Sequence, residues 1–136
     1  MTKVFISHST KDRDLVEEKI LGPLREAGIS WWYGPKNIEG GSEWEREILR
    51  GLSSCSHFIL AMTPDAADSP WVRTEVHWAI ENRFESLLPV VLPPVPAEEF
   101  HLRLIGVQRI DLTSEDGGSQ LLSLLQSRKE EEKPAP

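Results

Sequence analysis

The chain has 136 residues, of which 39% are hydrophobic and 27% are charged, and its formal net charge is −7 at pH 7. This size and composition predict one domain with its own core, and the negative charge argues against direct binding to nucleic acid or to an anionic membrane. The apolar runs are too short to span a bilayer, and the single Cys55 excludes an internal disulfide, which favours a cytoplasmic location.

Short apolar runs alternate with amphipathic stretches from the N-terminus onward. The run from Lys3 to Ser7 predicts a buried strand, and apolar residues at helical spacing predict a helix from Asp12 to Ala27 that stops at Gly28. Gly22-Pro23 inside this helix predicts a kink or a break, because proline lacks an amide hydrogen. The β-branched and aromatic run from Ile29 to Tyr33 predicts a second strand.

Two later helices have sequence signals for their first residues. The run Ser42-Glu43-Trp44-Glu45 has capping-box spacing, and Ser69 followed by Pro70 supplies an N-cap and a favoured first residue. In chain order, the remaining predictions are a helix from Ser42 to about Leu52, a strand from His57 to Met62, a loop from Thr63 to Asp68, a helix from Pro70 to about Asn82, strands from Leu87 to Leu92 and from Val107 to Leu112, and a helix from Gln120 to Gln126.

Alternating strands and helices predict an α/β fold. We expect a flavodoxin-like, doubly wound parallel sheet of five strands in the order 2-1-3-4-5, with helices on both faces. This domain is expected to span residues 1–128, followed by a charged, proline-rich tail or linker over 129–136. Ligands of such sheets bind beyond the carboxyl ends of the strands, here between strands one and three.

Glu75 is the most informative residue near that predicted crevice. Trp71, Glu75 and Trp78 have the spacing i, i+4 and i+7, which places them on one stripe of a helix, beside an aliphatic stripe formed by Val72, Val76, Ala79 and Ile80. A half-covered carboxylate between indole rings suits a ligand with a ring and hydroxyl groups. In the alternative interpretation, Glu75 pairs with Arg73 or Arg83 and both tryptophans belong to the core.

The polar turn after the first predicted strand is a second candidate binding element. Ser7, His8, Ser9 and Thr10 offer hydroxyls and amides to a phosphate or diphosphate, although such turns also serve simply as helix caps. Neither the glycine-rich dinucleotide fingerprint nor a P-loop is present. The four histidines are scattered and one cysteine stands alone, so we expect no structural zinc site.

Three motifs in the right order resemble those of a TIR (Toll/interleukin-1 receptor) domain over about residues 3–128. The run from Val4 to Asp12 resembles the first family box. The run from Gly28 to Tyr33, followed by that from Ile38 to Trp44, resembles the second strand and the BB loop. The run from Ser69 to Glu75 matches the Ser-x-Trp-x-x-x-Glu pattern of enzymatic, bacterial-type members.

The resemblance implies an NAD⁺ glycohydrolase or ADP-ribosyl cyclase in immune, stress or antiphage signalling, with Glu75 as the catalytic residue. NAD⁺ would be the substrate, with no cofactor and no metal, and the domain would self-associate and work with a fused or partner signalling domain. The implied substrate-binding residues are Ser7, His8, Ser9, Thr10, Trp71 and Trp44, and the implied oligomer-forming BB loop contains Pro35, Lys36, Asn37, Ile38, Gly40 and Gly41.

One carboxylate is sufficient for this chemistry. Most glycosidases need a second carboxyl group to protonate the leaving group, whereas nicotinamide leaves NAD⁺ as a neutral amine and needs no general acid. A single carboxylate that stabilises the oxocarbenium-like centre can therefore serve. The alternatives are a non-enzymatic TIR–TIR scaffold, a nucleoside-processing enzyme such as a deoxyribosyltransferase, and a module that binds a nucleotide signal without turning it over.

Overall fold

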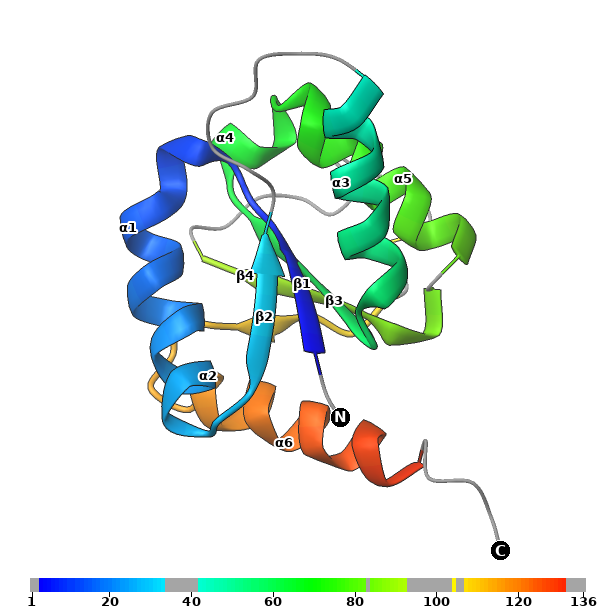
Figure 1. The fold of residues 1–136 in the computed structure, drawn as a ribbon. Helices are drawn as coiled ribbons and strands as arrows, with labels where there is room; N and C mark the ends of the chain where they lie inside the picture. The colour runs from blue at the N-terminus through cyan, green and yellow to red at the C-terminus, as the bar shows by residue number, and fades with distance from the viewer. Residues whose placement is uncertain (1–2, 34–41, 83, 93–103, 105–106, 132–136) are drawn as a thin grey trace, which may run out of the picture.

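A parallel sheet forms the centre of the protein in a computed structural model, which describes residues 3–33, 42–82, 84–92, 104 and 107–131. Among these residues, five strands lie in the order β2-β1-β3-β4-β5, and each is parallel to its neighbours (Figure 1). The predicted topology is confirmed. The strands are β1 (Lys3–Ser7), β2 (Ser30–Tyr33), β3 (His57–Met62), β4 (Leu87–Val91) and β5 (Ile110–Asp111).

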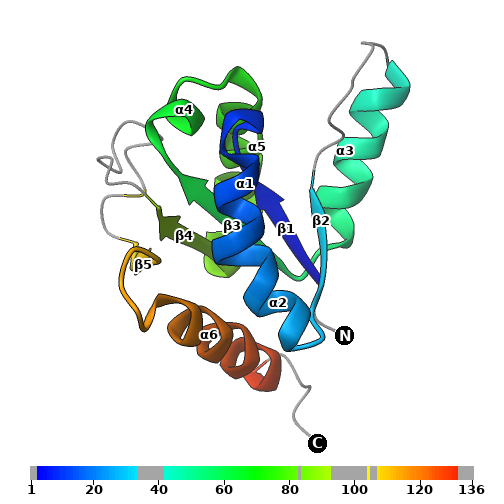
Figure 2. The same cartoon turned by 90° about the vertical axis from the view of Figure 1, so that its left-hand side faces the viewer.

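Helices cover both faces of the sheet, as the two views in Figures 1 and 2 show. On one face pack α1, α2 and α6, and on the other pack α3, α4 and α5. The longer helices are α3 (Ser42–Ser54), α5 (Pro70–Asn82) and α6 (Gly117–Glu131). The shorter segments are η1 (Thr10–Asp12), α1 (Arg13–Val16), η2 (Glu17–Leu21), α2 (Gly22–Glu26), α4 (Pro64–Ala67) and η3 (Phe84–Ser86).

Each face of the sheet has its own apolar core. In β1, Val4 and Ile6 belong to the core beneath α1, α2 and α6, whereas Phe5 belongs to the core beneath α3, α4 and α5. Both faces of this central strand are buried because a parallel sheet is covered on both sides. Ser7, two residues after Phe5, therefore lies on the same face as α5.

Aromatic rings join three neighbouring strands. Phe5 stacks on Trp32 of β2 with ring centroids 5.0 Å apart, and on Phe58 of β3 at 5.2 Å. In the sheet, Phe5 lies opposite Trp32 on one side and Phe58 on the other, and this register brings the three rings into contact. Trp31 packs against the opposite core, and the Arg25 guanidinium lies 5.5 Å from its ring centroid. Both tryptophans are therefore partly buried against the cores, one on each face of the sheet.

The first helical segment passes through Pro23 without a break. A π-helical turn, η2, comes directly before α2, which begins with Gly22-Pro23. Proline cannot donate the i→i−4 hydrogen bond and its ring crowds the preceding turn, and a wider turn accommodates both effects. Instead of the predicted kink or break, the helix changes here from a π-helical turn to an α-helix. Gly28 ends the segment as predicted, with φ of 70°.

The C-terminal elements differ in length from their predictions. Strand β5 contains only Ile110 and Asp111, which pair with Val90 and Val91 of β4. Helix α6 begins earlier and ends later than predicted, and it runs through the expected domain boundary at 128 to Glu131. Its final residues are mostly good helix formers, which explains the extension.

The carboxyl ends of β1 and β3 lie side by side, since Ser7 pairs with Leu60. From this edge of the sheet the chain continues into η1 and α4, and α5 follows α4 after two residues. The edge is the one at which a ligand site was predicted. None of the described helices has the length and hydrophobicity needed to cross a membrane.

Candidate active site

Helix α5 presents Glu75 to the carboxyl edge of the sheet. It begins as predicted, because Pro70 occupies its first position and the Val72 amide donates to the Ser69 hydroxyl at 3.3 Å. The predicted aliphatic stripe is confirmed, since its four members are buried against the sheet: Val72, Val76, Ala79 and Ile80.

The Glu75 carboxylate is more enclosed than the half-covered position predicted for it. Its side chain is 6% exposed, and its Oε1 atom accepts a hydrogen bond of 2.8 Å from the Ser7 hydroxyl. Burial raises the pKa of Glu75 from 4.5 to about 7, and the hydrogen bond from Ser7 opposes that rise. Near neutral pH the group can therefore hold or release a proton, which is common for functional carboxylates.

A structural ion pair does not account for Glu75 within the described residues. The Arg73 guanidinium donates from Nε to the Ala67 carbonyl at 2.8 Å. The ion pair found in the described part of the chain joins Arg25 to Glu17, on the other face of the sheet. Arg83, the other cation considered as a partner, lies outside the described residues.

The two indoles of the stripe have different environments. Trp71 is 47% exposed at the start of α5, whereas Trp78 is partly buried and packs against the core beneath α3, α4 and α5. The core interpretation therefore holds for Trp78. Trp71 exposes ring surface one helical turn before Glu75.

The turn after β1 is built largely by its own hydrogen bonds. The Ser9 hydroxyl accepts from the Lys11 amide at 3.2 Å and caps η1, so the capping interpretation is confirmed for this residue. The Nδ1 atom of His8 donates to the Ser9 carbonyl at 2.8 Å. Thr10 is exposed. From this turn, the Ser7 hydroxyl donates to Glu75.

Two hydrogen bonds of Thr63, which local sequence patterns did not predict, join η1 to α4. The Thr63 hydroxyl donates to the Asp12 carboxylate and accepts from the Ala66 amide at 3.0 Å. The prediction of a loop from Thr63 to Asp68 is wrong, because Thr63 caps α4 and Pro64 occupies its first position. The same signal, a hydroxyl residue followed by proline, identified the start of α5 and could have identified α4.

The sequence from 4 to 125 matches the family described as TIR domain. The chain belongs to the TIR domain family. The match covers all the strands described above, from Val4 of β1 to β5, and most of α6. The family suggested by the three motifs is thereby confirmed.

Known TIR proteins with similar sequences include two with activities on NAD⁺ or its derivatives in their names. The 2′ cyclic ADP-D-ribose synthase BtTIR of Bacteroides thetaiotaomicron is 26% identical over 89 residues, which cover 63% of this chain and 31% of that protein. The NAD(+) hydrolase TcpC of Escherichia coli is 25% identical over 89 residues, covering 65% and 29%. The match thus spans less than a third of the length of either relative.

A solved TIR structure shares the fold. The TIR domain of the Toll-related receptor TRR-2 from Hydra magnipapillata superposes with a TM-score of 0.75 at 16% identity, covering 90% of this chain and 97% of that one. At this level of identity the likeness supports the architecture of the TIR domain and carries no statement about activity.

Other predicted site residues of this TIR domain cannot be placed. Residues 34–41, which contain the expected BB loop, lie outside the described part of the chain, and so does the side chain of Trp44. Their predicted roles in self-association and substrate binding remain predictions.

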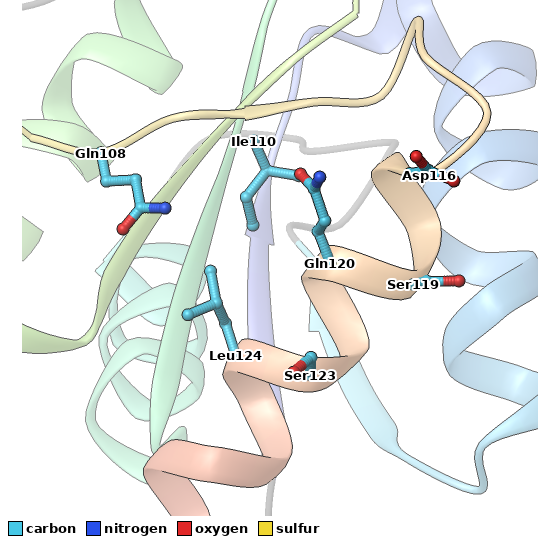
Figure 3. A pocket seen from close by; sticks show the side chains of 7 residues that line it. All are labelled: Gln108, Ile110, Asp116, Ser119, Gln120, Ser123 and Leu124. Carbon is cyan, nitrogen blue, oxygen red and sulfur yellow. The ribbon is translucent and has the colours of Figure 1, made fainter.

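A cavity of about 510 Å³ lies between β5 and α6 of the TIR domain, and Glu75 is not among its lining residues (Figure 3). Amide, hydroxyl and carboxyl side chains line it together with two aliphatic ones. None of its lining residues was predicted as a site residue: Gln108, Ile110, Asp116, Ser119, Gln120, Ser123 and Leu124.

Proposed function

We propose that this TIR domain cleaves NAD⁺ between nicotinamide and ribose, with Glu75 as the catalytic carboxylate. The observation that carries the proposal is a buried glutamate whose pKa is raised to about 7, hydrogen-bonded to the last residue of the central strand. The names of the two bacterial relatives add support, because both describe turnover of NAD⁺ or formation of a cyclic ADP-ribose.

The reaction breaks the bond between ribose C1′ and the pyridine nitrogen. Both bonding electrons go to that nitrogen, so nicotinamide leaves as a neutral molecule and the ribosyl carbon becomes cationic. When water captures the carbon, the water loses a proton and ADP-ribose forms. When a hydroxyl or an adenine nitrogen of the same molecule captures it, a cyclic isomer forms. Both routes release one nicotinamide and one proton for each NAD⁺.

Ionised Glu75 would stabilise the developing cation. In a buried site a fixed negative charge near the reacting carbon acts more strongly than it would in water. The substrate would also favour the charged form of Glu75, because a cationic pyridinium nearby opposes the effect of burial on the pKa. Since nicotinamide requires no proton on leaving, a second carboxyl group is unnecessary.

The other proposed contacts with NAD⁺ are assigned from where the residues lie along the carboxyl edge of the sheet. Exposed Trp71 would stack on a ring of the substrate. His8, Ser9 and Thr10 follow Ser7 and would lie towards the diphosphate. NAD⁺ acts here as a substrate, with no cofactor or metal in the proposed reaction. Self-association through residues 34–41 is part of the proposal, as is action in a signalling pathway.

Nicotinamide release by concentrated protein tests the proposal. The parent, Glu75→Gln and Glu81→Gln are incubated with NAD⁺, and the products are separated by chromatography. Glu81 is a matched control because it is an exposed glutamate on the same helix. We expect Glu75→Gln to lose at least about 100-fold in rate, and Glu81→Gln to match the parent. Equal rates for Glu75→Gln and the parent would reject the assignment.

Further arms of the experiment separate the alternative functions. Absence of turnover by every protein, even when the chains are forced to cluster, would favour a non-enzymatic scaffold. Cleavage of free nucleosides without NAD⁺ would indicate a deoxyribosyltransferase-like enzyme. Saturable NAD⁺ binding without products would indicate a nucleotide-binding module.

A further inference from the structure

Ser7 has an unusual position for a hydroxyl residue that was expected to bind substrate. Its side chain is only 1% exposed, and it lies at the end of the central strand, on the face covered by α5. Its hydroxyl hydrogen is already donated to Glu75 Oε1. A diphosphate therefore could not use this donor without breaking the bond to Glu75.

We propose that Ser7 is a positioning residue, which holds Oε1 of Glu75 so that Oε2 is the oxygen directed at the ribosyl carbon. This role rests on the proposed function. In the described part of the chain, Ser7 is the hydrogen-bond partner of Glu75, and it takes one of the two carboxylate oxygens. The other oxygen is left for the reaction.

The backbone that carries Ser7 is well placed for this task. Strand β1 is paired on both sides, with β2 and with β3, and Ser7 itself pairs with Leu60. Glu75 lies on a different element, α5, whose aliphatic stripe holds it to the same face of the sheet. The hydrogen bond thus ties the carboxylate to a strand that is paired on both sides, as preorganisation of a catalytic group requires.

Stability alone gives no reason for this pair. Burial has the larger effect on the pKa of Glu75, and the hydrogen bond from Ser7 only partly offsets it. An apolar pair of similar volume would avoid the desolvation of the carboxylate altogether. A buried polar contact that costs folding free energy is more readily explained by a role in the site.

Other ionisable groups near Glu75 do not replace Ser7 in this role. The shift in the pKa of Glu75 has burial and the Ser7 hydrogen bond as its causes. None of the other described ionisable side chains on or next to η1, α4 and α5 is changed in the test: these are His8, Lys11, Asp12, Arg13, Asp65, Asp68, Arg73, His77 and Glu81.

The test compares Ser7→Ala with Ser7→Thr, which keeps a hydroxyl. Ser56→Ala is the matched control, because Ser56 bonds to Lys3 at the opposite end of β1, where the Lys3 amide donates to its hydroxyl at 3.2 Å. We expect Ser7→Ala to lower kcat roughly ten- to hundred-fold with little change in KM for NAD⁺. Ser7→Thr should recover most of the loss, and Ser56→Ala should match the parent.

A second readout needs no turnover. The carboxyl resonance of Glu75 is titrated by NMR in protein with isotope-labelled glutamate, with Glu75→Gln used for its assignment. The parent should titrate near pH 7, and Ser7→Ala at higher pH, because a donor to the charged form is lost. An unchanged titration in Ser7→Ala, or an unchanged kcat, would overturn the positioning role.

The two readouts separate this inference from the proposed function. If Glu75→Gln abolishes turnover while Ser7→Ala keeps the kcat and the titration of the parent, NAD⁺ cleavage stands and the role of Ser7 is overturned. If the titration shifts in Ser7→Ala but no protein releases nicotinamide, the proposed function is overturned, and the catalytic role of Ser7 with it.

Discussion

The indole of Trp32 on β2 lies directly over Gly51 on α3. A Cβ atom on Gly51 would stand 2.6 Å from two of the indole ring atoms, which is closer than van der Waals contact permits. Because Trp32 is itself stacked on Phe5, it cannot move aside easily. The absence of a side chain at Gly51 therefore sets how closely α3 approaches the sheet.

Gly51→Ala should lower the free energy of unfolding by about 1–3 kcal/mol, because the clash moves α3 or the indole. This loss is expected although alanine is the better helix former by about 1 kcal/mol. Urea unfolding measures it. Gly22→Ala is the control, since a Cβ there would meet only the Glu17 carbonyl oxygen, at 3.7 Å. It should be neutral or slightly stabilising, and equal stabilities of the two variants would contradict the packing argument.

The stability of the parent relative to Glu75→Gln should depend on pH. Because the pKa of Glu75 rises from 4.5 to about 7 on folding, the folded state keeps a proton that the unfolded state releases between these values. The contribution of Glu75 to stability is fully present below pH 4.5 and is lost as the pH rises through about 7. The loss should be roughly 3 kcal/mol.

Denaturant unfolding of the parent and Glu75→Gln near pH 5 and near pH 8 checks this relationship. The free energy of unfolding of Glu75→Gln should rise relative to that of the parent as the pH rises. The variant Glu81→Gln should follow the parent at both values, since Glu81 is exposed. A constant difference between the parent and Glu75→Gln would mean that the carboxyl group titrates in the folded protein as it does in the unfolded chain.

The two tryptophans of α5 should respond differently to replacement by alanine. Trp71→Ala removes a side chain that is 47% exposed, so the free energy of unfolding should change by no more than about 0.5 kcal/mol, while KM for NAD⁺ rises. Trp78→Ala removes packing against the core and should cost about 2 kcal/mol or more. Thermal unfolding and initial rates measure both effects. An unchanged KM for NAD⁺ in Trp71→Ala would contradict the proposed stacking role of Trp71.

Thr63→Val should loosen the edge of the sheet next to Glu75. It removes the hydroxyl that bonds to Asp12 and caps α4, at an expected cost of about 1–2 kcal/mol. Thr63→Ser keeps the hydroxyl and should lose much less. Thr74→Val is a control at an exposed position of α5, where the hydroxyl donates to the Pro70 carbonyl at 3.0 Å. Chemical unfolding gives the free energy of unfolding of all three variants. Equal losses for Thr63→Val and Thr74→Val would contradict a special role for the Thr63 hydroxyl in joining η1 to α4.

Capping residues and apolar runs correctly predicted the ends of the helices and strands in which they occur, such as α5 and β3. Ser69-Pro70 marked the first turn of α5, and the run from His57 to Met62 matched β3 at both ends. The prediction failed at β5, where only Ile110 and Asp111 pair with the distant strand β4, because strand pairing depends on tertiary context more than on local sequence. It also failed at α4, where a usable start signal at Thr63 precedes a helix of only four residues.

The sequence by itself determined the alternation of strands and helices, the family, and the choice of Glu75, because each depends on residues a few positions apart. Only the tertiary structure decided what surrounds that carboxylate. Ser7 and Glu75 are 68 residues apart in the chain, and they meet because the sheet order places the end of β1 beneath α5. The enclosure that raises the pKa of Glu75, and the donor that opposes it, arise from the packing of these two elements.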